Sequence, residues 1–237
     1  IRKRTLEYDD VMNKQREIVY GFRGDIVRSE HVHEQLYDIL YDAVFARAEQ
    51  IAPSDDGEPL DKFIEWVRMA FPVAVRKQDF ENPEFTPDTI AEKVFEKVKA
   101  SYELKLQSED PLTVHEMERY VILRAIDSRW QDFLRSMDSL REGVGLRAYG
   151  QRDPLVEYKR EAYDMFETLM YDIKDDVAGQ IFRSSMSAEA QHRFLSALPQ
   201  TLVHDEVSIL GRGGVGRPRA PEGGETVTTS AGNREDE

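Results

Sequence analysis

Apolar side chains recur at helical spacing through most of this 237-residue chain. Over residues 1–28 they return every three or four positions with charged residues between them, which predicts an amphipathic helix. The same spacing over residues 30–51 predicts a second helix, and a shorter apolar pattern over residues 61–71 predicts a third. No stretch alternates apolar and polar residues as a half-buried strand does. The pattern therefore predicts an all-α protein.

Polar capping residues mark two further helix starts. Thr86 precedes Pro87. A threonine oxygen can accept a hydrogen bond from a free backbone amide, and proline is tolerated in the first turn because its missing N–H has no helical partner. Apolar residues from Ile90 to Leu106 form the stripe of this helix. Thr113 and Glu116 have the spacing of a capping box, so we expect the next helix to begin there.

The most regular apolar pattern has spacings of 3, 4, 3, 4 and 3, which is typical of a coiled-coil seam against one partner helix. The seam residues are Leu123, Ile126, Trp130, Phe133, Met137 and Leu140. A glycine-containing loop is predicted over Glu142–Arg152, and Asp153 with Pro154 predicts the start of the partner helix. Met165 and Leu169 of that helix are expected to pack against the seam. We expect a long antiparallel hairpin with arms of roughly 35 to 45 Å.

The predicted loop carries four residues suited to contact with another molecule: Leu146, Arg147, Tyr149 and Arg152. Tyrosine and arginine give a large contact area at low entropic cost, and a long hairpin presents its tip at a distance from the body. Alternatively, Leu146 and Tyr149 fold back onto the end of the hairpin. The residues alone leave both interpretations open.

The helical pattern weakens from residue 184, although Ala188–Leu198 could add a short helix. Half of the 14 glycines follow Leu210. We therefore expect residues 184–237 to be mostly disordered.

Composition excludes several classes of protein. Lysine plus arginine total 32 against 46 aspartate plus glutamate, and the net charge of −14 would repel a nucleic acid. The absence of cysteine excludes disulfides and suits the cytoplasm. Apolar runs reach only four residues, as in Tyr120–Leu123, against roughly 20 for a membrane span, so no membrane insertion is expected. The chain opens on Ile1 within a helical pattern, and we expect a piece of a longer protein.

No catalytic residue, cofactor or metal is expected in this chain. Gly211, Gly213 and Gly216 have dinucleotide-motif spacing, but the prolines that follow forbid the helix that this motif needs, and no Walker A sequence occurs. His31 and His33 point to different faces of a helix, so we interpret them as surface histidines. The other histidines are scattered along the sequence. The adjacent carboxylates at positions 9–10 and 175–176 are expected to be solvated or salt-bridged.

Several segments resemble the C-terminal half of SecA, the bacterial preprotein translocase motor. They are Leu6-Glu-Tyr-Asp-Asp-Val11, Trp130 through Met137-Asp-Ser-Leu-Arg141, Leu146-Arg-Ala-Tyr149, Gln151-Arg-Asp-Pro154 and Glu157-Tyr-Lys-Arg-Glu161. The resemblance covers roughly residues 1–183. It implies the end of a long scaffold helix at 1–29, an inserted helical wing domain at 30–115, the two-helix finger of the scaffold at 116–183, and a tail at 184–237.

The resemblance also implies a function. SecA hydrolyses ATP between two RecA-like domains and pushes unfolded secretory proteins through the SecY channel. ATP and Mg would be bound by those motor domains, which we do not expect in this chain. The finger enters the channel mouth and its loop tyrosine contacts the polypeptide, and Tyr149 occupies that position. The family usually has glycine before and alanine after this tyrosine, whereas Ala148 and Gly150 exchange these places.

The partners implied are the motor domains in cis, the SecY channel and an unfolded preprotein, for a cytoplasmic protein that is peripheral at the inner membrane. A second hypothesis is a freestanding helical adaptor or chaperone that binds extended peptides between wing and finger. An adaptor would have its own complete first helix, so the patterned start at Ile1 favours the fragment. An independent enzyme is a third hypothesis, supported only by the histidine and glycine signals above.

Overall fold

The computed structural model describes residues 2–51, 58–80, 86–146, 153–185 and 187–198. Within these ranges the chain forms seven α-helices and one 3-10 turn, without a strand, so the predicted all-α class is confirmed. The elements are α1 (Arg2–Arg28), α2 (Val32–Ala48), α3 (Glu58–Ala70), η1 (Lys77–Phe80), α4 (Pro87–Leu106), α5 (Pro111–Leu146), α6 (Pro154–Ile181) and α7 (Ala188–Ala197).

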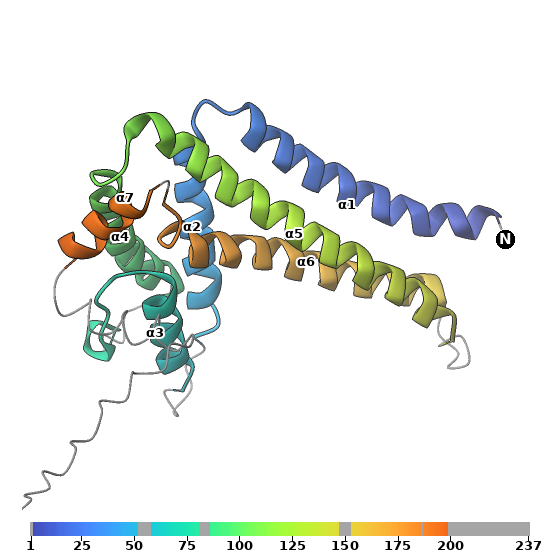
Figure 1. Cartoon of the computed structure of the whole chain (residues 1–237). Helices are drawn as coiled ribbons and strands as arrows, with labels where there is room; N and C mark the ends of the chain where they lie inside the picture. Colours follow the sequence, from blue (N-terminus) through green and yellow to red (C-terminus); the bar gives the residue numbers. More distant parts are fainter. Residues whose placement is uncertain (1, 52–57, 81–85, 147–152, 186, 199–237) are drawn as a thin grey trace, which may run out of the picture.

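Three long helices and four shorter ones make two parts of the molecule. Helices α1, α5 and α6 run side by side and form what we call the arm (Figure 1). Helices α2, α3, α4 and α7 gather at one end of the arm and form what we call the head (Figure 1). Both α1 and α6 run antiparallel to α5, so the N-terminus lies at the end of the arm that is remote from the head.

One continuous apolar core fills the arm and extends into the head. Most of the predicted seam of α5 is buried, including Ile126 at 0% and Met137 at 2% exposed, and only Leu123 is partly exposed. The ring of Phe133 meets the edge of Phe166 on α6 at 6.0 Å between centroids. The two long antiparallel helices that the sequence predicts are therefore present.

The expectation of one partner helix for α5 is wrong, because α1 packs on it as well. The ring of Trp130 contacts Tyr20 of α1 edge-on at 6.1 Å. The buried surface of α5 is wider than a seam: Val121 and Ala125 beside it are each 1% exposed. A wide apolar face needs more than one neighbour, and α1 and α6 share it.

The predicted start of α5 at Thr113 is also wrong. The helix begins at Pro111, and the Thr113 hydroxyl donates to the carbonyl of Asp110 at 2.9 Å. Proline fits the first turn, so the helix starts two residues before the pair with capping-box spacing. A capping box does occur at Thr86, the predicted cap of α4, where the Thr86 amide donates to Oγ1 of Thr89 and the Thr89 amide donates back to Oγ1 of Thr86.

At its other end α5 continues to Leu146, so the loop predicted from Glu142 is too long. A Cβ atom added at Gly143 would meet no atom within 4 Å, and Val144 is buried at 2% exposed. A helical glycine costs only about 1 kcal/mol, and packing of the next residue offsets this. Residues 147–152, which join α5 to α6, lie outside the described residues.

The predicted starts of α6 and of a short C-terminal helix are confirmed. The carboxylate of Asp153 accepts from the amide of Leu155 at 2.9 Å, with Pro154 at the first position. Helix α7 is capped by Ser187 and buries Phe194 against Phe182 of the head-side end of α6. In the tail at 184–237, which is expected to be mostly disordered, α7 is the described helix, and residues 186 and 199–237 lie outside the described residues.

Candidate functional site in the arm and at its joints with the head

The residues predicted to contact a partner are the last residue of α5 and residues that follow it in the sequence, and α5 ends at the end of the arm that is remote from the head. Leu146 is the last residue of α5, and α6 begins eight residues later at Pro154 (Figure 1). The side chain of Leu146 and all of Arg147, Tyr149 and Arg152 lie outside the described residues. The structure thus describes the two helix ends that this segment joins.

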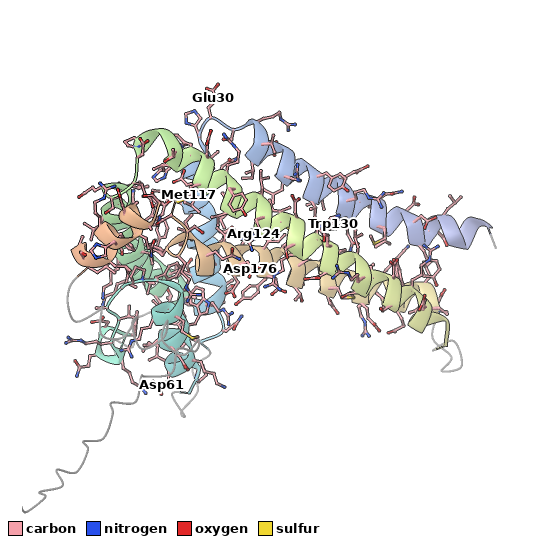
Figure 2. All side chains as sticks on the ribbon, in the orientation of Figure 1. Glu30, Asp61, Met117, Arg124, Trp130 and Asp176 are labelled. Atoms are coloured by element: carbon pink, nitrogen blue, oxygen red, sulfur yellow. The ribbon has the colours of Figure 1, made fainter. Side chains whose placement is uncertain are left out.

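Farther along the arm toward the head, the side chains predicted to stiffen the hairpin pack together. Trp130 stacks on Phe133 at 5.4 Å between centroids, and Figure 2 shows Trp130 between α5 and α1. Met137 and Leu169 are buried, and Met165 is partly buried. These aromatic and aliphatic contacts fill the space between the three helices of the arm, which makes bending the arm costly because each contact would open a void.

A hollow of about 220 Å³ opens between α5 and α6 on the surface of the arm. It is lined by Arg129, Asp132, Phe133, Ser136, Met165, Thr168, Leu169 and Asp172. Three of the five stalk residues predicted from the sequence, Phe133, Met165 and Leu169, are part of this lining.

Ion pairs cross between the helices of the arm at three levels. Arg129 donates twice to Asp176 of α6, at 2.6 and 2.7 Å. The other two pairs join α1 to α5, from Arg23 to Asp127 at 2.8 Å and from Arg141 to Asp9 at 3.2 Å. All six side chains are partly exposed, so each pair contributes only about 0–1 kcal/mol. Their main effect is to fix the register of each helix relative to its neighbour.

A second polar joint fixes α6 against the head. The guanidinium of Arg47 on α2 and the indole N–H of Trp66 on α3 both donate to Oδ1 of Asp175, at 3.0 and 2.9 Å. The centre of that guanidinium also lies 5.3 Å from the ring of Trp66 and 5.1 Å from the ring of Tyr171. The adjacent carboxylates at 175 and 176 are thus salt-bridged, as expected, but to different helices on either side of α6.

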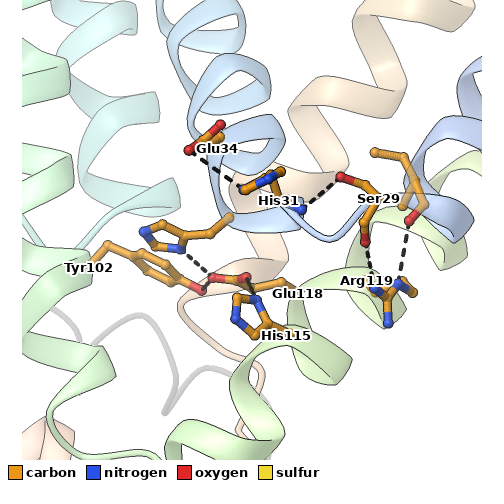
Figure 3. A network of polar contacts seen from close by, with 9 residues as sticks. Ser29, His31, Glu34, Tyr102, His115, Glu118 and Arg119 are labelled. Carbon is orange, nitrogen blue, oxygen red and sulfur yellow. Dashed lines mark hydrogen bonds and ion pairs between the residues drawn. The ribbon is translucent and has the colours of Figure 1, made fainter.

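The third joint is a buried carboxylate at the corner where α1 gives way to α2 (Figure 3). Glu118 of α5 is fully buried and accepts from the hydroxyl of Tyr102 at 3.0 Å. Nδ1 of His33 lies 2.7 Å from Oε1 of the same carboxylate, and Nδ1 of His115 lies 3.6 Å from Oε2. When Glu118 is ionised its oxygens only accept, and Nδ1 of His33 is then the donor.

His33 is therefore not the surface histidine that the sequence predicted. Its side chain is 27% exposed and packs beside the rings of Tyr37 and Tyr102, whereas His31 is 75% exposed as expected. His115, which looked isolated in the sequence, faces the same carboxylate. Its partner Glu118 is only three residues away, a helical spacing that could have suggested this contact, but nothing in the sequence links His33 to position 118.

Two features are absent from the part of the chain that the structure describes. Within the described ranges, no group of histidine, aspartate and glutamate side chains is arranged to hold a metal ion. Among the helices of the same ranges, none combines the length and the hydropathy that a membrane span requires.

Comparison with known proteins identifies the family. The family model described as "SecA Wing and Scaffold domain" matches residues 1–185. The protein translocase subunit SecA of Streptomyces coelicolor is 35% identical over 197 residues, which cover 80% of this chain and 21% of that protein. The subunits of Heliobacterium modesticaldum and Aquifex aeolicus are 36% and 35% identical, covering 77% and 81% of this chain and 22% and 19% of those proteins.

This chain thus spans about a fifth of the length of the curated relatives it matches. The match includes all three helices of the arm and three of the four helices of the head, so sequence similarity and structure concern the same residues. The chain belongs to the SecA wing and scaffold family.

Proposed function

We propose that this chain is the scaffold, wing and finger part of a SecA-type translocase. In this proposal, α1 is the end of the scaffold helix and the α5–α6 pair is the two-helix finger. The domain limits at residues 29/30, 115/116 and 183/184 are part of the same proposal. ATP and Mg would be bound by motor domains elsewhere in the full protein, and the chain by itself would be noncatalytic.

The observation that carries the proposal is the construction of the arm as a stiff lever. Helix α5 has 36 residues, which at 1.5 Å per residue is about 54 Å. It is packed along its length against α1 and α6, and ion pairs fix the register of all three helices. A movement imposed on α1 or on the head would therefore move the remote end of the arm instead of bending it. Such a lever transmits force and does not need a catalytic centre.

The remote end would deliver that movement to an unfolded secretory polypeptide. Tyr149 is the proposed contact residue, with Leu146, Arg147 and Arg152 around it. An aromatic ring suits this role because it makes apolar contacts with many different sequences and requires no specific partner group. Tight, selective binding would instead hinder a polypeptide that must keep moving.

The proposed partners are the motor domains in cis, the SecY channel and the preprotein. The full protein would be cytoplasmic and peripheral at the inner membrane, held there by the channel. Anionic lipid would repel a chain with a net charge of −14. A nucleic acid would be repelled for the same reason.

The test is Tyr149→Ala in the full-length protein that contains this chain. We expect transport of a preprotein into membrane vesicles to fall several-fold while ATP hydrolysis without preprotein stays unchanged, because in this proposal the motor domains bind the nucleotide and Tyr149 contacts only the polypeptide. Tyr149→Phe, which keeps the ring, should retain most of the transport. Tyr163 of α6 is 60% exposed on the side of the arm, so Tyr163→Ala is the matched control and should leave transport unchanged.

Unchanged transport by Tyr149→Ala would rule out the role proposed for the tip. Coupling itself is tested by measuring ATP hydrolysis by separately expressed motor domains with and without this chain. A change in rate supports the scaffold role. If the rate does not change and the chain alone binds unfolded peptide, the protein is better described as a helical adaptor.

A further inference from the structure

Glu118 is unusual in this molecule because it is a fully buried carboxylate at the meeting point of α2, α4 and α5. Burying a charge is costly unless it is paired and hydrogen-bonded. Oε1 accepts from Tyr102 and contacts His33, but Oε2 has no hydrogen-bond partner among the described residues. Besides the hydroxyl of Tyr102, the groups that face this carboxylate are imidazole rings, His33 at Oε1 and His115 at 3.6 Å from Oε2.

The position of Glu118 makes it a fastening point between the arm and the head. It is followed on α5 by Arg119, whose guanidinium donates to the carbonyls of Ile26 and Ser29 at the end of α1, at 3.4 and 2.9 Å. Two consecutive residues therefore hold different parts of the corner (Figure 3). Arg119 holds α1, and Glu118 holds α2 and α4 of the head.

The other charged groups near this site do not replace the histidine. Glu103 and Lys99 of α4 face His33 with opposite signs, and their effects on its pKa oppose each other. Glu103 is also bonded to the hydroxyl of Tyr37 at 2.7 Å. Lys105 of α4 is near Glu118 but is committed to the buried Glu109, with Nζ and Oε1 3.0 Å apart.

We propose that the proton on His33 is a switch that fastens the head to the arm. When His33 is protonated, its imidazolium lies against the buried Glu118 carboxylate and holds the head against the arm. Without the proton, the carboxylate keeps the hydrogen bond from Tyr102 and one from a neutral ring at Oε1, but the cation at Oε1 is lost, and His115, whose Nδ1 lies 3.6 Å from Oε2, is too far away to replace it by a hydrogen bond. The fastening through Glu118 then weakens while the hold of Arg119 on α1 is retained, and the head moves more freely relative to the arm.

The direction of the pH dependence follows from the contact. The hydrogen bond to Glu118 raises the pKa of His33 above its ordinary value of 6.5 in spite of partial burial. A group whose pKa is higher in the folded state stabilises that state fully below its unfolded pKa. This stabilisation is lost as the pH rises through the raised, folded-state pKa. The head is therefore held firmly against the arm in mildly acidic solution. The contact loosens as the pH rises above the folded-state pKa of His33.

The first measurement is an NMR titration of the imidazole rings in the 237-residue chain. We expect His33 to titrate above the pKa of a histidine in an unstructured peptide, and Glu118→Gln to abolish that upward shift. Glutamine keeps an acceptor for Tyr102 and His33 but carries no charge, so the fold should survive. A His33 ring in the unmodified chain that titrates at or below the peptide value would overturn the proposal, whether or not any variant folds.

The second measurement follows the movement itself. The chain has no cysteine, so spin labels can be placed uniquely through Tyr163→Cys in the arm and Glu96→Cys on an exposed position of α4. We expect the distribution of distances between the labels to broaden as the pH rises through the titration of His33. The distribution should not respond to pH when Glu118→Gln is added, and His192→Gln, on α7, is the matched control that should leave the response intact. A distribution that is independent of pH in the labelled chain would overturn the switch.

Discussion

Lys105 and Glu109 form a buried ion pair in which the two side chains are 0% and 2% exposed. Burial lowers the pKa of Lys105, and Glu109 opposes that effect. Removing one member leaves the other charge buried without compensation, so we expect Lys105→Met to lower the free energy of unfolding by about 3–5 kcal/mol. Adding Glu109→Gln should restore a large part of that loss. Urea unfolding at pH 7 measures both variants, and a double variant as unstable as the single one would contradict this account.

Single residues are also where sequence analysis is weakest. The start of α6 was predictable, because Asp153 and Pro154 act within a few residues of each other. The contact between His33 and Glu118 joins positions 85 residues apart, and no local pattern encodes it. Arg147, Tyr149 and Arg152 were singled out as contact residues by their chemistry and their place in the predicted loop, but only the resemblance to SecA favoured that role over folding back, and these residues lie outside the described residues.

At the scale of elements, hydrophobic spacing located the long helices but not all of their ends. The glycines after Glu142 suggested a loop, yet α5 continues to Leu146 because Val144 is buried in the core of the arm. Tertiary packing outweighs the low helix propensity of one glycine. The same limit explains why α1 was missed as a neighbour of α5, because spacing within one helix does not say how many helices cover it.

The continuation of α5 leads to a prediction for Gly143. A Cβ atom at this position would meet nothing within 4 Å. Alanine has the higher helix propensity and loses less conformational entropy on folding, so we expect Gly143→Ala to raise the free energy of unfolding by about 0.5–1 kcal/mol. Thermal unfolding followed by circular dichroism measures this. A loss of stability would mean that residue 143 is not helical in solution.

At the scale of the whole molecule, one apolar core joins arm and head. The tryptophans make it possible to measure whether the two parts unfold together. The chain has two tryptophans: Trp66 is in α3 of the head and Trp130 is in α5 of the arm. Trp66→Phe leaves a fluorophore in the arm only, and Trp130→Phe leaves one in the head only. Because buried residues of both parts belong to one cluster, we expect each part to unfold together with the whole.

The expected result is the same urea midpoint by fluorescence and by far-ultraviolet circular dichroism within each variant. Comparing two signals within one variant removes the effect of the substitution on stability, since Trp66→Phe also loses the hydrogen bond to Asp175. The experiment belongs at pH 6, where the proposed His33 switch is closed. If the head fluorophore changed at lower urea than the helical signal, arm and head would be separate cooperative units. A lever that transmits force between head and arm requires that the two parts unfold in a single transition. If the contact between them unfolded first, the lever would bend there under load.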